Sequence, residues 1–287
     1  MRDGPQAGRR LGRRTTEPTV DDLDRSYIAL TKAVAALEPH LEALTLVGAQ
    51  AIYVHAPEMS DFGVAATSDA DVVVDVDLLG DSPLLVDALQ GGGFRRASRD
   101  RPGIWLTEVD AYPVTFDLIV PETFAGPGTR GARLGVHGKE AATRSAGTEL
   151  CLRDRERLSI PVPDGEAPFT MWVAGPPALL CAKAFKLHDR LADSARQDRV
   201  RAKDASDVWR LMSVTAPAAI ASTWGQLEQD PTIGAVAVLG RRLFIDLFDD
   251  GGAGAALADQ ALRAERAYDP GTVTDWVGEF RDRMSAD

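Results

Sequence analysis

The sequence predicts an α+β protein in which an N-terminal mixed β-sheet flanked by helices precedes a C-terminal helical domain. Two observations predict this class. Residues 44–120 contain short apolar and β-branched runs separated by turn residues. Residues 178–285 show helical periodicity interrupted only by Pro, Gly and Asp. We therefore divide the chain into residues 1–17, 18–165 and 166–287.

The individual elements follow from local pattern. Leu44–Val47 is a short buried strand, and Gly48 turns it into a short helix. The hairpin turn Asp110–Pro113 joins two apolar runs. Strands are expected at residues 44–47, 69–77, 103–109, 114–120 and 158–162. Helices are expected at residues 19–37, 48–54, 82–90, 178–192, 200–213, 216–228, 233–249, 254–267 and 272–284. Residues 121–150, rich in Gly and Thr, give no clear prediction.

Composition narrows the classes of function that the chain can have. With 45% hydrophobic and 26% charged residues, the chain is typical of globular proteins rather than disordered or fibrous ones. Its apolar runs are far shorter than the roughly 18 residues of a membrane span, so we expect no membrane association. Two cysteines cannot form a disulfide framework, which favours the cytoplasm. The net charge of −11 argues against a protein whose main role is to coat nucleic acid.

The first residues differ from this acidic average. Residues 1–14 carry five arginines against one aspartate, a charge of about +4. No apolar segment follows the arginine pairs, as an export signal would require. We therefore predict that residues 1–17 form a disordered basic tail.

Three aspartates are the main candidates for chemistry. Asp69 and Asp71 alternate along a predicted strand, so their side chains point to the same side, about 7 Å apart. Two such carboxylates repel each other unless a positive group, typically Mg²⁺ or Mn²⁺, lies between them. Asp117 interrupts the apolar strand 114–120, where a buried carboxylate is costly without a partner. An isolated Asp-x-Asp is more often an exposed acidic strand end, but three such acids can bind two metal ions for nucleotidyl transfer.

A second group is basic. Residues 183–210 carry eight Lys and Arg against five Asp, about +3 in an acidic chain. Lys183, Lys186 and Arg190 share one helix face, and Asp204 and Asp207 share a face of the next helix. A structural interpretation is that ion pairs join the two helices. A functional interpretation is that Lys183 and Arg190 contact a triphosphate while the two acids hold them in place.

Five segments follow one another over about residues 44–210. They are Gly48-Ala49-Gln50, Thr67-Ser68-Asp69-Ala70-Asp71, Asp117, Ala182-Lys183 with Arg190, and Arg201-Ala202-Lys203-Asp204-Ala205-Ser206-Asp207. Together they resemble the nucleotidyltransferases of the AbiEii toxin group, within the DNA-polymerase-β-like superfamily. The ordered set, ending in Lys-Asp-x-x-Asp, is more specific than the Asp-x-Asp element alone.

The resemblance implies a polymerase-β-like nucleotidyltransferase fold whose core is residues 18–165, with the helical domain closing a cleft. It implies that Asp69, Asp71 and Asp117 bind the metal and, with Lys183, are catalytic; Asp117 is also a candidate base. The nucleotide-binding residues that it implies are Gly48, Ala49, Gln50, Ser68, Lys183, Arg190 and Asp204. Gly48 would let the backbone approach the triphosphate. One departure is Ala49, where the family normally has Gly or Ser, so a hydroxyl donor is missing and Gln50 is a candidate substitute.

The resemblance thus implies a Mg²⁺- or Mn²⁺-dependent enzyme that moves an NMP from an NTP to an acceptor and releases pyrophosphate. The acceptor expected from the group is tRNA, with a protein as the competing choice, and the chain would be a toxin with a cognate antitoxin. Two alternatives stay open. Ala49 favours a nucleotide-binding module that has lost transfer activity, and the same fold also serves small-molecule adenylyltransferases that modify antibiotic hydroxyls.

Overall fold

The structure, a computed structural model, describes residues 20–59, 67, 69–163, 167–193, 202–263, 268–269 and 271–285. The predicted basic tail at residues 1–17 lies outside these residues, as do Ser68 and Arg201 of the motifs quoted above.

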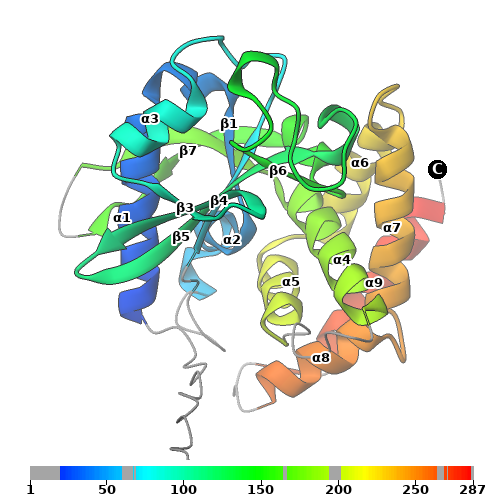
Figure 1. Cartoon of the computed structure of the whole chain (residues 1–287). Coiled ribbons are helices and arrows are strands. Elements are labelled where there is room, and N and C mark those ends of the chain that lie inside the picture. The colour runs from blue at the N-terminus through cyan, green and yellow to red at the C-terminus, as the bar shows by residue number, and fades with distance from the viewer. Residues whose placement is uncertain are drawn as a thin grey trace, which may run out of the picture.

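A single mixed sheet organises the first part of the chain, which confirms the α+β class (Figure 1). Its order is β3-β4-β5-β2-β1-β8-β7, and β6 pairs with β5 beside this path. Pairs β1–β8, β2–β5 and β5–β6 are parallel, and the others are antiparallel. The strands are β1 Leu44–Val47, β2 Asp69–Val74, β3 Arg95–Ser98, β4 Arg101–Val109, β5 Tyr112–Pro121, β6 Thr143–Ser145, β7 Arg155–Ile160 and β8 Phe169–Ala174.

Helices α4 to α9 gather on one side of the sheet (Figure 1). The described helices are α1 Val20–Ala36, α2 Gly48–His55, α3 Leu85–Gly91, α4 Pro176–Ala192, α5 Ala202–Val214, α6 Pro217–Glu228, α7 Gly234–Phe248, α8 Ala253–Leu262 and α9 Gly271–Ser285. Helix α2 packs against β2 as well as against α4 and α5, so it connects the sheet to the later helices. None of the described helices is both long and apolar enough to cross a membrane.

The centre of the sheet is rigidly packed. Val72, Val73 and Val74 of β2 are fully buried, as the β-forming run predicts. One continuous hydrophobic core runs from the sheet into the helical part and includes both Trp105 of β4 and Trp224 of α6. Because β2 and β5 lie inside this core, polar side chains on them are held in fixed positions.

The hairpin of β4 and β5 is confirmed. Asp110 and Ala111 at its turn have positive φ angles of 51° and 65°, the backbone of a tight two-residue hairpin turn. The antiparallel register places Ile104 of β4 opposite Asp117 of β5. Since β5 also pairs in parallel with β2, the hairpin carries Asp117 to the middle of the sheet.

The structure corrects the predicted boundary between residues 165 and 166. Phe169–Ala174 forms β8, which pairs in parallel with β1 and antiparallel with β7. The boundary therefore cuts the sheet, and the helical part begins with α4. The six-residue run of β8 leads through Gly175 directly into Pro176 of α4, so in the sequence it merges with the apolar start of the helix. Strand β3 was likewise not predicted.

Candidate active site

The acidic residues stand on two neighbouring strands. Asp71 of β2 pairs in register with Asp117 of β5, and Asp69 pairs with Thr115. Side chains in register on adjacent strands point to the same face, and Asp69 shares that face because it lies two residues from Asp71. The prediction that acids from separate segments meet on one face of the sheet is therefore confirmed.

Asp71 and Asp117 repel each other in a poorly solvated place. Burial, and then the charges of Asp71 and Asp69, raise the pKa of Asp117 to about 8. Burial and the Asp69 charge raise the pKa of Asp71 to about 6. The Oδ1 atom of Asp117 is buried without a hydrogen-bond partner. A positive group beside this pair would relieve both costs.

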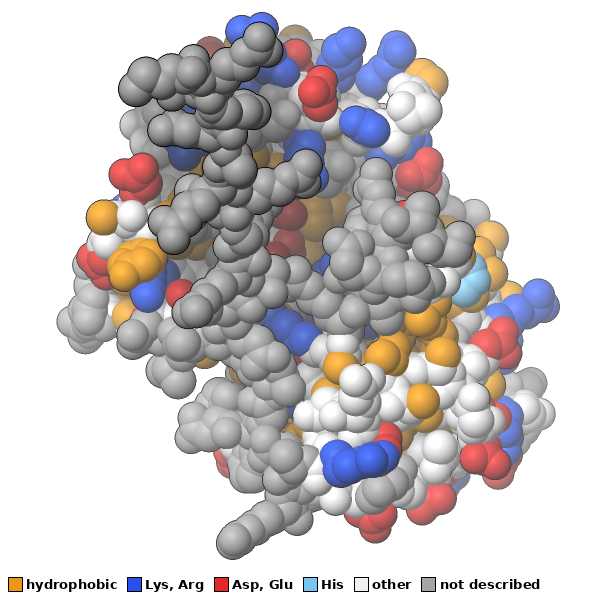
Figure 2. Space-filling model, turned by 60° about the horizontal axis from the view of Figure 1, so that its bottom comes forward, with side chains coloured by type: hydrophobic (Ala, Val, Ile, Leu, Met, Phe, Trp, Pro, Cys, Tyr) orange, Lys and Arg blue, Asp and Glu red, His pale blue; other side chains and the backbone are white. Residues whose placement is uncertain are grey.

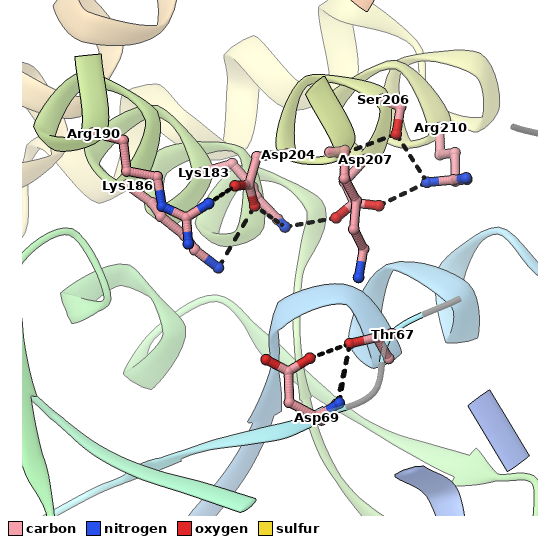
Figure 3. Close-up of polar contacts among 10 residues, drawn as sticks. Thr67, Asp69, Lys183, Lys186, Arg190, Asp204, Ser206, Asp207 and Arg210 are labelled. Atoms are coloured by element: carbon pink, nitrogen blue, oxygen red, sulfur yellow. Dashed lines mark hydrogen bonds and ion pairs between the residues drawn. The ribbon is translucent and has the colours of Figure 1, made fainter. Parts of the chain in front are cut away.

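Asp69 has a different environment. The hydroxyl of Thr67 donates a hydrogen bond to its Oδ1 (Figure 3). Burial alone would raise the pKa of Asp69, but Thr67 and the nearby charges of Lys186, Lys203 and Lys183 outweigh it and lower the pKa below its usual value. The lowered pKa of Asp69 favours its ionised form, whereas the raised pKa values of Asp71 and Asp117 favour their protonated forms. The role of Thr67 was not predicted, although it lies in the quoted motif.

Gly48 lies directly against the carboxylate of Asp71. It has φ +70°, and a Cβ atom there would lie 2.2 Å from Oδ2 of Asp71. Val47, the residue before it, pairs with Asp71 in the sheet. The resemblance implied that Gly48 lets the backbone approach a triphosphate. In the structure, the carboxylate of Asp71 occupies the space that a side chain at Gly48 would need.

Ala49 and Gln50 do not line the cavity between the sheet and α4. Both are buried in α2, and neither is among the residues that line the cavity described below. The Nε2 group of Gln50 donates to Ser26 of α1 over 2.9 Å. Their predicted contact with a nucleotide is therefore not supported, because Gln50 joins α2 to α1 instead.

Opposite the acids, α4 and α5 carry a network of ion pairs (Figure 3). Nζ of Lys183 lies 3.0 Å from Asp204 and 2.7 Å from Asp207. Lys186 and Arg190 also pair with Asp204. The structural interpretation of the sequence, that ion pairs join the two helices, is thus confirmed.

The network fixes the charge of its members. Burial would lower the pKa of Lys183, but Asp207 and Asp204 raise it well above its usual value. Burial would raise the pKa of Asp204, but the charges of Lys183, Lys186 and Arg190 hold it far below its usual range. Arg210 pairs with Asp207 over 2.7 Å. Among the described residues, four cations thus pair with the two carboxylates of α5.

A cavity of about 670 Å³ separates the two groups. Gly48, Asp71 and Asp117 line it from the sheet side. Lys183, Lys186 and Arg190 line it from α4, whereas Asp69 and Asp204 do not line it. Figure 2 shows a hollow with acidic side chains deep inside it and Lys and Arg side chains at its border. This volume is in the range that small-molecule and cofactor sites occupy.

Part of the cavity comes from a segment that the sequence left unassigned. Arg144 and Ser145 of β6 line it, as does Thr129. Arg144 forms an ion pair with Glu122 over 2.8 Å, and its Nε atom is buried without a hydrogen-bond partner. Only the pairing of β6 with β5 brings this arginine to the cavity, so no local sequence signal could have found it.

The fit to a metal ion is partial. Among the described residues, no three His, Cys, Asp or Glu side chains come together in an arrangement that would hold a metal ion. The predicted ligand set of Asp69, Asp71 and Asp117 is therefore not assembled, since Asp69 is engaged by Thr67. Asp71 and Asp117 do fit a divalent cation, because they stand side by side with raised pKa values and an unpartnered oxygen.

Comparisons with known proteins leave the family open. The sequence matches no protein-family model and no curated protein. Among solved structures, it is similar to the crystal structure of an antigenic nucleotidyltransferase-like protein from Paracoccidioides brasiliensis, with 13% sequence identity and a TM-score of 0.34. That match covers 78% of this chain and 95% of the other. A likeness at this level decides neither family nor activity.

The raised pKa of Asp117 predicts a pH-dependent stability. The folded state keeps a proton on Asp117 up to about pH 8, whereas the unfolded chain loses it near pH 4, so stability falls as pH rises between these values. In EDTA, the melting temperature of the wild type should therefore fall relative to that of Asp117→Asn between pH 5 and pH 8, by roughly 2 °C or more. Parallel melting curves for the two proteins across this range would contradict the assignment.

The close approach at Gly48 predicts a coupled loss of stability. Gly48→Ala should lower the free energy of unfolding by about 1–3 kcal/mol, because the new Cβ strains the backbone and meets Asp71. Urea unfolding measures this change. The same substitution made in an Asp71→Ala background should cost at least about 1 kcal/mol less.

Gly91→Ala is the matched control for this cycle. Gly91 has no neighbour within 4 Å of an added Cβ and no positive φ, so its replacement should change little. Equal costs for Gly48→Ala with and without the Asp71 carboxylate would show that the two residues do not meet.

Proposed function

We propose that the protein is a nucleotidyltransferase that transfers a nucleoside monophosphate from a nucleoside triphosphate to a hydroxyl acceptor. One observation supports this most directly. Two adjacent carboxylates, Asp71 and Asp117, face the cations of α4 across a cavity large enough for a nucleotide. The carboxylates can attract a divalent cation, and the cations opposite them can attract phosphate. This arrangement suits phosphoryl transfer better than a reaction on an uncharged substrate.

In this proposal, the cations of α4 and the acids of α5 have different roles in binding the nucleotide. Lys186 and Arg190 line the cavity, and the Lys186 side chain is 43% exposed, so they can meet a triphosphate. Lys183 is held by Asp204 and Asp207 and contributes its charge from a fixed position. Asp204 thus acts on the nucleotide through the cations that it holds.

The transfer itself needs a proton acceptor. The acceptor oxygen forms a bond to the α-phosphorus as the bond to pyrophosphate breaks, and its proton leaves. Asp117 is the candidate to take this proton, because its carboxylate lines the cavity beside Asp71 and has an oxygen without a hydrogen-bond partner. Asp71 and Asp117 would hold Mg²⁺ or Mn²⁺, which when bound supplies positive charge to the phosphate oxygens.

Several finer assignments stay predictions from the sequence. They are membership of the AbiEii group, a role as a toxin, a cognate antitoxin, tRNA as acceptor and a cytoplasmic location. The division into a transferase core and a helical domain is likewise a proposal, since both parts share one hydrophobic core.

A second candidate is a nucleotide-binding module without transfer activity. Its support is that Lys183 and Asp69, two of the expected catalytic groups, are both engaged within the protein. An antibiotic adenylyltransferase would use the same cavity and differ only in its acceptor. Calorimetry with each NTP and Mg²⁺ separates a module from an enzyme, because a module would bind without turnover.

A transfer assay tests the proposal. The protein is incubated with each α-labelled NTP, Mg²⁺ and total cellular RNA or protein, and the label in the acceptor is measured. We expect labelled product from the wild type and at least about 100-fold less from Asp71→Asn, which loses a carboxylate of the cavity.

Asp87→Asn on the exposed side of α3 is the matched control and should transfer like the wild type. Equal labelling by Asp71→Asn and the wild type, or no labelling with any NTP, would refute the transferase.

A further inference from the structure

A second, smaller pocket adjoins the main cavity. It has a volume of about 310 Å³ and is lined mainly by the segment 127–133 together with Arg99, Lys139 and Glu140. Thr129 lines both this pocket and the main cavity, so the two are neighbours at that residue. A molecule that fills the smaller pocket therefore lies next to the cavity that Asp117 lines.

The smaller pocket is strongly basic. Arg99, Arg130, Arg133 and Lys139 line it, against one acid, Glu140. Glu140 is already paired with Arg96 of β3. Within the described part of the chain, none of the four cations has a carboxylate partner, and Arg130 donates a hydrogen bond to the carbonyl of Asp100. This unneutralised charge stands out in a chain whose net charge is −11.

The basic segment is tied to the main cavity by Arg144 as well. Arg144 of β6 lines the main cavity and donates a hydrogen bond to the carbonyl of Gly128, which lines the smaller pocket. The segment also packs closely on its neighbour, since a Cβ at Gly131 would lie 2.1 Å from the carbonyl oxygen of Lys139. The segment 127–133 is thus held both to β6 and to residue 139.

We propose that this pocket binds the phosphodiester backbone of a nucleic-acid acceptor whose reactive end enters the main cavity past Thr129. The inference rests on the proposed transferase function and names the class of its acceptor. Guanidinium groups match phosphate oxygens in a two-point geometry, and three of the four cations are arginines.

The lining also indicates how such a strand is recognised. No aromatic side chain is among the described residues that line the smaller pocket, so it offers no platform for stacking bases. Contacts to phosphates position a strand without reading its sequence. The pocket therefore binds the backbone and leaves sequence preference to the reactive end in the main cavity.

Binding of a fluorescein-labelled RNA hairpin with a single-stranded 3′ end tests the site. Anisotropy of the full chain is measured from 50 to 200 mM KCl, without NTP. Arg130→Glu/Arg133→Glu should bind at least about 10-fold more weakly than the wild type, with a salt dependence shallower by about one to two ions. Arg242→Glu/Arg283→Glu, exposed on α7 and α9, makes the same change in net charge and should bind like the wild type.

The outcomes separate this site from the transferase itself. Equal binding by the two double variants, or no binding by the wild type up to about 100 µM at 50 mM KCl, would overturn the site. Equally tight binding of a poly-glutamate peptide, lost in the same variant, would overturn it in favour of an acidic protein. Absence of nucleotidyl transfer, with RNA binding lost only in Arg130→Glu/Arg133→Glu, would refute the proposed activity while supporting the nucleic-acid site.

Discussion

The repulsion between two half-buried carboxylates is the constraint on which this site depends. Asp71 and Asp117 stand in register on adjacent parallel strands, inside a sheet that cannot move them apart. A protein without a use for them would be more stable with apolar residues there, as at Val73 and Ile119 two positions further along the same strands. The carboxylate of Asp71 occupies the space that a side chain at Gly48 would need. The same pair of acids therefore also requires a glycine at the start of the neighbouring helix.

The helical part of the chain compensates this negative charge. Asp204 and Asp207 hold Lys183, Lys186, Arg190 and Arg210 in one network. Helix α2 packs on β2 and on both basic helices, so the acids and the network are placed relative to each other by direct contact. The cavity between them therefore has Asp71 and Asp117 on one side and Lys183, Lys186 and Arg190 of α4 on the other.

Much of this arrangement could be predicted from local pattern. The two-residue period of a strand puts Asp69 and Asp71 on one side, and helical spacing puts Lys183, Lys186 and Arg190 on one face. The parallel pairing of β2 with β5 could not be predicted, because it joins segments far apart in the chain. The same holds for β8 and for Arg144, which tertiary pairing alone brings into place. Gly48 was identified because it has no side chain. That the carboxylate of Asp71 lies in the space left by this missing side chain depends on side-chain positions in the folded state.

Binding of Mn²⁺ tests the central claim most directly. Free Mn²⁺ is followed by electron paramagnetic resonance at pH 8 in titrations of the wild type, Asp71→Asn, Asp117→Asn and the exposed-site variant Asp87→Asn. If the carboxylate pair is a cation site, the wild type and Asp87→Asn bind Mn²⁺ equally, and each of the other two variants binds at least about 10-fold more weakly. No Mn²⁺ binding by the wild type, or equal binding by all four proteins, would contradict it.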